Sequence, residues 1–162
     1  MNNIFPRFDR YRRRRPDAYA NIMGDAAHPE IVGAVGFYKT RLGVIVTATV
    51  QGLPKSTDKC TSPIFAFHIH GGGSCTGNSD DPFANAKAHY NPRGCKHPYH
   101  AGDLPPLFGA NGYAFLTVLI NRFTVDEIIG KTVIIHSFAD DFTSQPSGMA
   151  GAKIACGEIV SG

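Results

Sequence analysis

The sequence contains no tryptophan, few charged side chains and no long apolar run among its 162 residues. Because no stretch reaches the roughly 18 consecutive apolar residues of a transmembrane helix, we expect no membrane insertion. The N-terminal residues also lack the apolar segment of about 7–15 residues that a signal peptide needs, and none follows the arginines that precede Pro16. We therefore expect neither a secretory signal nor a twin-arginine export signal.

Helical periodicity is missing as well. No window in residues 18–51 repeats apolar side chains every 3–4 positions over a length that would make a helix. The 18 glycines and 11 prolines are many for a helical protein and normal for short strands joined by turns. The chain length suggests one domain with a full core, which we place at residues 18–162.

Positive charge is concentrated in an N-terminal arm, residues 1–17. The arm carries six arginines and two aspartates, a net charge of +4, whereas the other 145 residues carry a net charge of −1. The basic character therefore belongs to the arm and not to the domain. Two interpretations stay open: a solvated, disordered tail, or a contact for a polyanion such as nucleic acid or an anionic surface.

Alternating and strongly apolar segments predict about eight short β-strands, with at most one helical turn at 124–130. Seven such segments are delimited, at 18–24, 31–39, 44–51, 64–70, 113–120, 131–136 and 152–159. Two long connections, 71–102 and 137–151, separate some of them. This pattern is typical of an antiparallel barrel or sandwich with two large loops.

The segment 64–70 places two histidines on one side of a strand. A period of two puts Phe65, Phe67 and Ile69 on the core face and His68 and His70 together on the opposite face. Two imidazoles in this arrangement can coordinate one metal ion. The alternative is two unrelated surface histidines, because a His-x-His pair also arises by chance.

The loop 71–102 is too long for an ordinary connection in a compact domain, and it holds three members of a cluster of four ligand-type residues. His89, His97, His100 and Asp103 lie within fifteen residues. Imidazole and carboxylate suit zinc, and four such ligands complete a closed tetrahedral site with no position for a water. We predict a zinc cage that orders the loop, with His89 shared with a second metal, and no zinc hydrolase.

Several motifs now occur in order along the chain. They are Phe67-His-Ile-His70, His89-Tyr-Asn-Pro92, His97, His100-Ala-Gly-Asp103, His136 followed by Asp140-Asp141, and Ala155-Cys156-Gly157. In these motifs the chain from about Ala18 to Ile159 resembles the copper/zinc superoxide dismutase family. The resemblance implies an all-β fold, an eight-stranded antiparallel Greek-key β-barrel (immunoglobulin-like sandwich) with a long metal-binding loop and a shortened electrostatic loop.

The resemblance also implies roles for individual residues. Copper would be held by His68, His70, His89 and His136, and zinc by His89, His97, His100 and Asp103. His89 would bridge both metals as an imidazolate, and Asp140 would bond His68 and His97 behind them. Cys75 and Cys156 would form the family's disulfide.

The resemblance implies an antioxidant enzyme, an oxidoreductase that converts superoxide to O2 and hydrogen peroxide. It needs a metal that cycles by one electron, which copper does and zinc does not. His89 and Lys153 would be the catalytic side chains. The alternative is a non-catalytic copper- and zinc-binding protein on the same fold, but all seven ligand positions are filled, which favours the enzyme.

Three features depart from the family pattern. Lys153 stands where the family has an arginine beside the copper channel; it keeps the charge but loses the planar fork, so we expect lowered activity. No charged residue lies between Asp141 and Lys153, so we expect weaker steering of the anion. Cys60 and Cys95 are extra cysteines that form either a second disulfide or two free thiols.

Oligomeric state and compartment follow less directly. The family contains both dimers and monomers. A homodimer is compatible with the resemblance, but the sequence does not determine the oligomeric state. Cysteine pairs usually indicate an oxidising compartment, yet cytosolic members of the family keep their disulfide. We therefore expect a cytoplasmic protein.

Overall fold

Short antiparallel strands make up nearly all of the regular structure. The computed structural model describes residues 14–58 and 63–162. The strands are β1 Ala18–Gly24, β2 Val32–Thr40, β3 Gly43–Gln51, β4 Ile64–His70, β5 Asp103–Phe108, β6 Ala114–Ile120, β7 Thr132–His136, β8 Lys153–Glu158 and β9 Val160–Ser161. The helical turns are the 3-10 turn η1 Ala84–Ala86 and the short helix α2 Val125–Ile128.

The strands pair in the order β5-β4-β7-β8-β1-β2-β3-β6, and the two-residue β9 adds to β1. Strands that are distant in sequence therefore lie side by side, as in β4 with β7 and β1 with β8. The two ends of this order, β5 and β6, also contact each other and nearly close a barrel. The expected all-β, eight-stranded barrel is confirmed, with β9 as a small addition.

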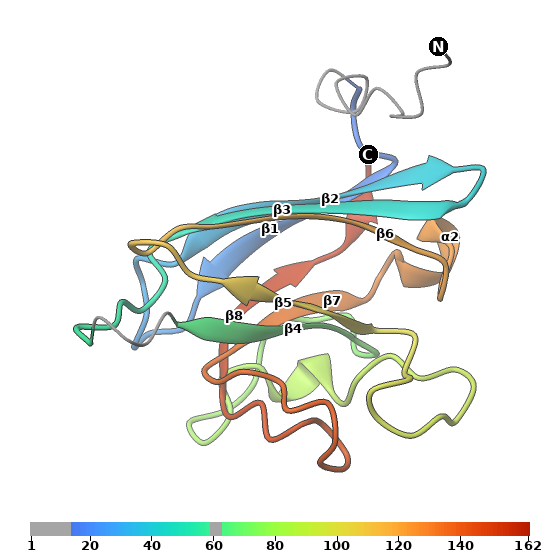
Figure 1. Cartoon of the computed structure of the whole chain (residues 1–162). Helices are drawn as coiled ribbons and strands as arrows, with labels where there is room; N and C mark the ends of the chain where they lie inside the picture. The colour runs from blue at the N-terminus through green and yellow to red at the C-terminus, as the bar shows by residue number, and fades with distance from the viewer. Residues whose placement is uncertain (1–13, 59–62) are drawn as a thin grey trace.

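Figure 1 shows the strands as two layers. β1, β2, β3 and β6 form one layer, and β4, β5, β7 and β8 form the other. The two long loops, 71–102 and 137–151, both extend from the second layer on the side away from the first. This arrangement gives the second layer a covered outer face.

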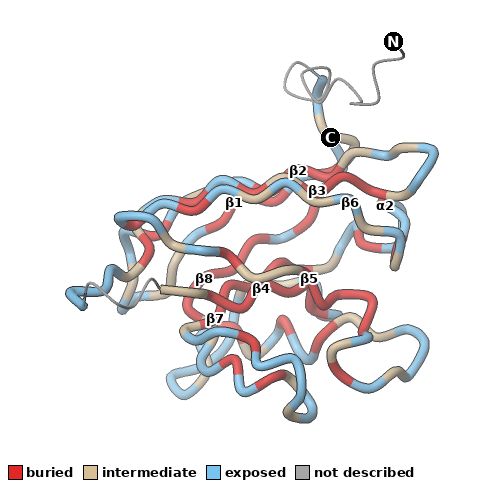
Figure 2. The backbone as a smooth tube through the Cα atoms, viewed as in Figure 1, coloured by how far each residue is buried: buried red, intermediate tan, exposed pale blue. Residues whose placement is uncertain are grey.

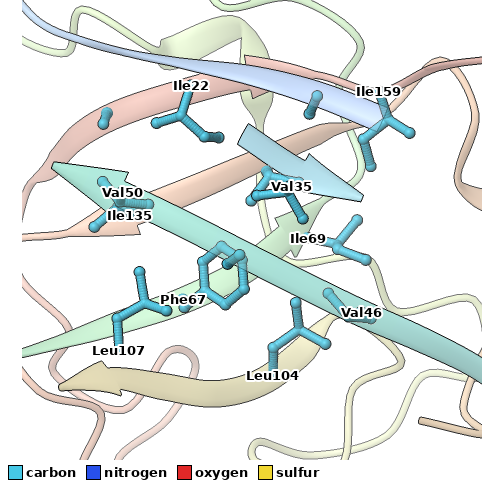
Figure 3. Close-up of a cluster of buried hydrophobic side chains, with 14 of the residues drawn as sticks. Ile22, Val35, Val46, Val50, Phe67, Ile69, Leu104, Leu107, Ile135 and Ile159 are labelled. Carbon is cyan, nitrogen blue, oxygen red and sulfur yellow. The ribbon is translucent and has the colours of Figure 1, made fainter. Parts of the chain in front are cut away.

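The space between the layers is filled by alternate apolar side chains. Phe67 is fully buried there, with Val46 from the opposite layer and Leu104 and Leu107 from β5 in the same cluster (Figure 3). Removing such a ring by Phe67→Ala would cost about 3–5 kcal/mol of stability. The core face predicted for β4, with Phe65, Phe67 and Ile69, is confirmed.

β4 and β7 are buried on both faces, which is unusual for antiparallel strands in a small barrel. Residues 65–70 and 132–136 are all buried, as the continuous red segments in Figure 2 indicate. One face packs into the core, and the long loops cover the other. His68 and His70 therefore lie in the interior, and they are not surface histidines.

β5 is a strand that the alternation pattern does not reveal. Its sequence, Asp-Leu-Pro-Pro-Leu-Phe, carries Pro105 and Pro106, which cannot donate backbone hydrogen bonds to a neighbour. β5 ends the strand order, so one of its edges lies outside the main pairing and tolerates prolines. For that reason the local sequence pattern does not indicate a strand here.

Residues 1–13 of the arm and Cys60 lie outside the described residues, so the predictions made for them are not addressed by the fold. At the barrel end of the arm, Asp17 is tied down: its backbone N–H donates to Phe37 O at 2.9 Å, and its carboxylate accepts from Lys39 N at 2.8 Å. Within residues 14–58 and 63–162, no helix is long and apolar enough to cross a membrane.

Candidate metal centre

The site is built on the outer face of β4 and β7, beneath the two long loops. β4 presents His68 and His70, and β7 ends at His136 on the neighbouring strand. The loop 71–102 returns to β4 through an isolated bridge between His89 and His70. Residues far apart in sequence are thereby brought together by backbone pairing.

Two groups of ligand-type residues result, and they share His89. The four-histidine group contains His68, His70, His89 and His136, and the Asp103 group contains His89, His97, His100 and Asp103. Within each group the candidate ligand atoms lie within 4.8 Å of one another, and all seven residues are buried. Every ligand residue predicted from the sequence is thus found in its predicted group.

In the four-histidine group, backbone carbonyls fix the tautomers of two rings. Lys87 O accepts from His70 Nδ1 at 2.7 Å, and Gly151 O accepts from His136 Nδ1 at 3.3 Å. Each neutral ring then carries its hydrogen on Nδ1, so the lone pairs of the two Nε2 atoms face each other at 3.2 Å. Two facing lone pairs repel each other unless a cation lies between them.

The other two rings also direct unpaired nitrogens into this group. His68 Nε2 is 2.8 Å from Asp140 Oδ2, and His68 Nδ1 is buried without a hydrogen-bond partner among the described residues. His89 Nε2 is likewise buried without a partner. A buried polar atom left unsatisfied costs about 1–3 kcal/mol, so these four nitrogens fit a bound metal ion.

Burial keeps three rings of this group, those of His68, His70 and His136, in their neutral, ligating form. Desolvation lowers the pKa of His70 well below its usual range, and it also lowers the pKa of His68. Desolvation lowers the pKa of His136 to about 3. Neutral imidazole is the form that binds a metal, so no proton has to leave these rings at neutral pH.

The Asp103 group gathers three Nδ1 atoms around one carboxylate. His89 Nδ1 is 2.8 Å from Asp103 Oδ1, and His100 Nδ1 is 3.2 Å from Asp103 Oδ2. His97 Nδ1 is 3.1 Å from Asp103 Oδ2 but outside hydrogen-bonding geometry, so in the described part of the chain it is buried without a hydrogen-bond partner. Three imidazoles and one carboxylate in this arrangement suit zinc.

Asp140 connects the two groups from behind. Its Oδ2 lies 2.8 Å from His68 Nε2, and its Oδ1 lies 2.8 Å from His97 Nε2. Burial alone would raise the pKa of Asp140, but hydrogen bonds from His68, the backbone N–H of Phe142 and His97 lower it to about 2. The ionised carboxylate fixes both ring orientations and leaves both Nδ1 atoms free to bind metal.

Gly148 is a residue of this site that the sequence analysis missed. Its φ is +70°, and a Cβ at this position would lie 2.0 Å from Asp140 Oδ1 and 2.7 Å from His97 Nε2. Only glycine lets the loop 137–151 pack directly on the Asp140–His97 contact. A glycine among several small residues gives no sequence signal for this role.

Arg122 is a second missed residue. Its Nη1 donates to three backbone carbonyls of the ligand loop: Pro98 O at 2.9 Å, Asp103 O at 3.3 Å and His100 O at 3.4 Å. Arg122 lies just after β6 and is distant in sequence from the loop that it holds. A short-range motif cannot predict such a contact.

The disulfide between Cys75 and Cys156 is present, with Cα atoms 5.6 Å apart. It joins the loop 71–102 to β8, and the Cys156 side packs in a small apolar cluster with Phe83 and Ile134. This predicted bond is confirmed. Cys95 bonds to no cysteine of the described part of the chain, and because Cys60 lies outside that part, their pairing stays a prediction.

A pocket opens to solvent over the four-histidine group. Its lining includes His70, His89 and His136, together with Lys153 on the wall. Lys153 Nζ donates to Asp81 Oδ2 at 2.5 Å and to Phe83 O at 3.1 Å. The predicted cation therefore lies beside the pocket, paired with a carboxylate that the sequence analysis did not identify.

Barrel and site together define a class: a β-barrel metalloprotein in which one imidazole belongs to two adjoining metal-binding groups. Comparison with known proteins agrees with this. A family profile described as copper/zinc superoxide dismutase matches residues 31–159. The chain belongs to the copper/zinc superoxide dismutase family, so its cofactors are copper and zinc.

Individual relatives agree with the family assignment. The chain is 32% identical over 145 residues to "Superoxide dismutase [Cu-Zn] 2" of Aquifex aeolicus, covering 80% of each chain. It is 34% identical over 151 residues to "Superoxide dismutase [Cu-Zn]" of Photobacterium leiognathi, covering 85% of this chain and 83% of that protein. The structure of the Cu/Zn superoxide dismutase from Brucella abortus superposes with a TM-score of 0.73 at 25% identity, over 87% of this chain and 98% of that one.

Proposed function

We propose that the protein dismutes superoxide, with copper held by the four-histidine group and zinc by the Asp103 group. The observation that carries the proposal is His89, whose Nε2 is an unpartnered atom in one group while its Nδ1 lies in the other. Copper, when bound, supplies one-electron redox chemistry, and zinc does not. Two superoxide anions and two protons then give O2 and hydrogen peroxide.

The side chains of the chain supply positioning and a proton. His89 is placed to hold a proton at Nε2, because its Nδ1 is retained in the Asp103 group. Asp140 keeps His68 and His97 in their ligating orientation. Lys153 supplies positive charge at the pocket wall, where a small anion approaches.

The test uses a ligand found in only one group. His136→Ala in copper- and zinc-loaded protein should abolish dismutation and copper binding while zinc stays near one per chain. His28→Ala is the matched control. His28 Nδ1 lies 2.7 Å from Asp25 Oδ1 in a turn, and His28 belongs to neither metal-binding group. If fully loaded wild-type protein is no more active than free copper, the chain is instead a non-catalytic metal-binding protein.

A separate measurement tests whether Lys153, in place of the family's arginine, lowers the activity. Arginine offers a planar, multiply donating cation, so Lys153→Arg should raise the second-order rate constant for superoxide. An unchanged rate would mean that this side chain does not contact the approaching anion.

Three further expectations belong to the proposal. Sedimentation measurements should give a homodimer, and a monomer at micromolar concentration would contradict this. The arginine-rich arm should bind a polyanion weakly, which removal of residues 1–17 would abolish without loss of dismutation. Fractionation of the source cells should recover the protein from the cytoplasm.

A further inference from the structure

The contact between Asp81 and Lys153 lies at the pocket wall and is not explained by metal binding. Lys153 begins β8 and is paired with His136 of β7. Its ammonium has three N–H donors, of which Asp81 Oδ2 takes one at 2.5 Å and Phe83 O takes another at 3.1 Å. Within residues 14–58 and 63–162 the third donor has no hydrogen-bond partner, so it is available to an incoming anion.

The charges that line the pocket cancel. Lys87 and Lys153 contribute two positive charges, and Asp80 and Asp81 contribute two negative ones. The loop on the opposite side adds no charge between Asp141 and Lys153. An anion at a distance therefore meets a rim whose charges sum to zero, and the field of these balanced charges is largely screened beyond about 10 Å at moderate salt.

Asp81 is fixed in place by more than the lysine. The backbone N–H of Phe83 donates to its Oδ1 at 3.0 Å, so Oδ1 holds the loop turn and Oδ2 faces Lys153. The Asp81 side chain is 40% exposed and the Lys153 side chain 15% exposed. The carboxylate thus stays in solvent contact while it holds a mostly covered ammonium.

We propose that Asp81 is a positioning residue that lowers the affinity of the pocket for anions by competing for the Lys153 ammonium. Superoxide is itself a small anion, so it must share this cation with a carboxylate that is always present. The inference rests on the proposed function only for the identity of the substrate. Anion binding to the pocket can be measured without turnover.

The chain supplies a matched pair of variants. Asp81→Asn and Asp80→Asn each remove one negative charge from the pocket lining, but no hydrogen bond joins Asp80 to Lys153 among the described residues. Asn at position 81 keeps an oxygen for the Phe83 N–H, so the loop turn is preserved. Asp81→Glu restores the carboxylate.

The readouts are the azide dissociation constant of copper- and zinc-loaded protein, followed optically, and the salt dependence of the superoxide rate. At low ionic strength, Asp81→Asn should tighten azide binding and raise the rate constant by about 2- to 5-fold. Asp80→Asn should do so by less than half as much, and Asp81→Glu should behave like wild type. The gain should shrink at high salt.

A Lys153→Gln background separates pairing from simple charge. There, Asp81→Asn and Asp80→Asn should have equal effects, because no ammonium remains to be released. Equal effects in the wild-type background, or a weaker azide affinity in Asp81→Asn, would overturn the inference. An inactive wild-type protein that still binds azide as described would refute the proposed function and leave this inference standing.

Discussion

The disulfide between Cys75 and Cys156 should contribute a large share of the stability of the metal-free protein. It joins residues 81 positions apart, about half of the chain. In the chain-entropy description, closing a loop of this length in the unfolded state is worth about 4.5 kcal/mol at 25 °C. Residual structure in the unfolded chain lowers that figure, so we expect a loss of about 2–4.5 kcal/mol when the bond is removed.

The variant that tests this is Cys75→Ala with Cys156→Ala. Alanine is chosen because Cys156 is 2% exposed, and a serine hydroxyl there would be buried in an apolar cluster. Denaturant unfolding of the metal-free variant and of oxidised wild type gives the difference in unfolding free energy.

Repeating the measurement with reductant provides the control. Reduced wild type should approach the double variant, whereas any further loss in the reduced double variant reports a bond between Cys60 and Cys95. A difference below about 1 kcal/mol between oxidised wild type and the variant would refute the loop-closure reasoning.

The remaining predictions concern the metal centre. Asp140→Asn should weaken retention of both metals by about 10- to 100-fold in chelator competition, because His68 and His97 lose the carboxylate that orients them. The exposed neighbouring substitution Asp141→Asn should leave retention unchanged, and equal losses in the two variants would contradict the role of Asp140. The metal-free protein should lose stability as pH falls from about 6.5 towards about 3, because the buried rings of His68, His70 and His136 have lower pKa values folded than unfolded. Each ring contributes up to about 1.4 kcal/mol per pH unit, so acid titration of the unfolding free energy that stays flat over this range would contradict the buried neutral rings.

Much of the barrel is predictable because its strands are local patterns. Phe65, Phe67 and Ile69 alternate with His68 and His70, and that alternation alone decides which side chains enter the core. The strand β5 is not predicted, because its two prolines are unusual in a strand. Its place at the end of the strand order, which permits prolines, is a property of the whole sheet.

The two metal-binding groups are predictable for a different reason. His89, His97, His100 and Asp103 lie within fifteen residues, so their spacing is visible in one segment. His136 is far from that segment, and only resemblance to a family assigns it to the same site. In the structure β7 pairs with β4, and the side chain of His136 at the end of β7 reaches His70, with the two Nε2 atoms 3.2 Å apart.

The sequence does not predict which distant side chains contact each candidate site residue. Lys153 is identifiable as a cation near the pocket, but its partner Asp81 lies 72 positions earlier in a loop with no motif. The loop reaches Lys153 because the Cys75–Cys156 disulfide and the packing of Phe83 hold it against β8. The disulfide therefore also affects the charge of the pocket. A variant that lacks the disulfide should release Lys153 from Asp81, and it should bind azide more tightly than wild type, as Asp81→Asn is expected to do.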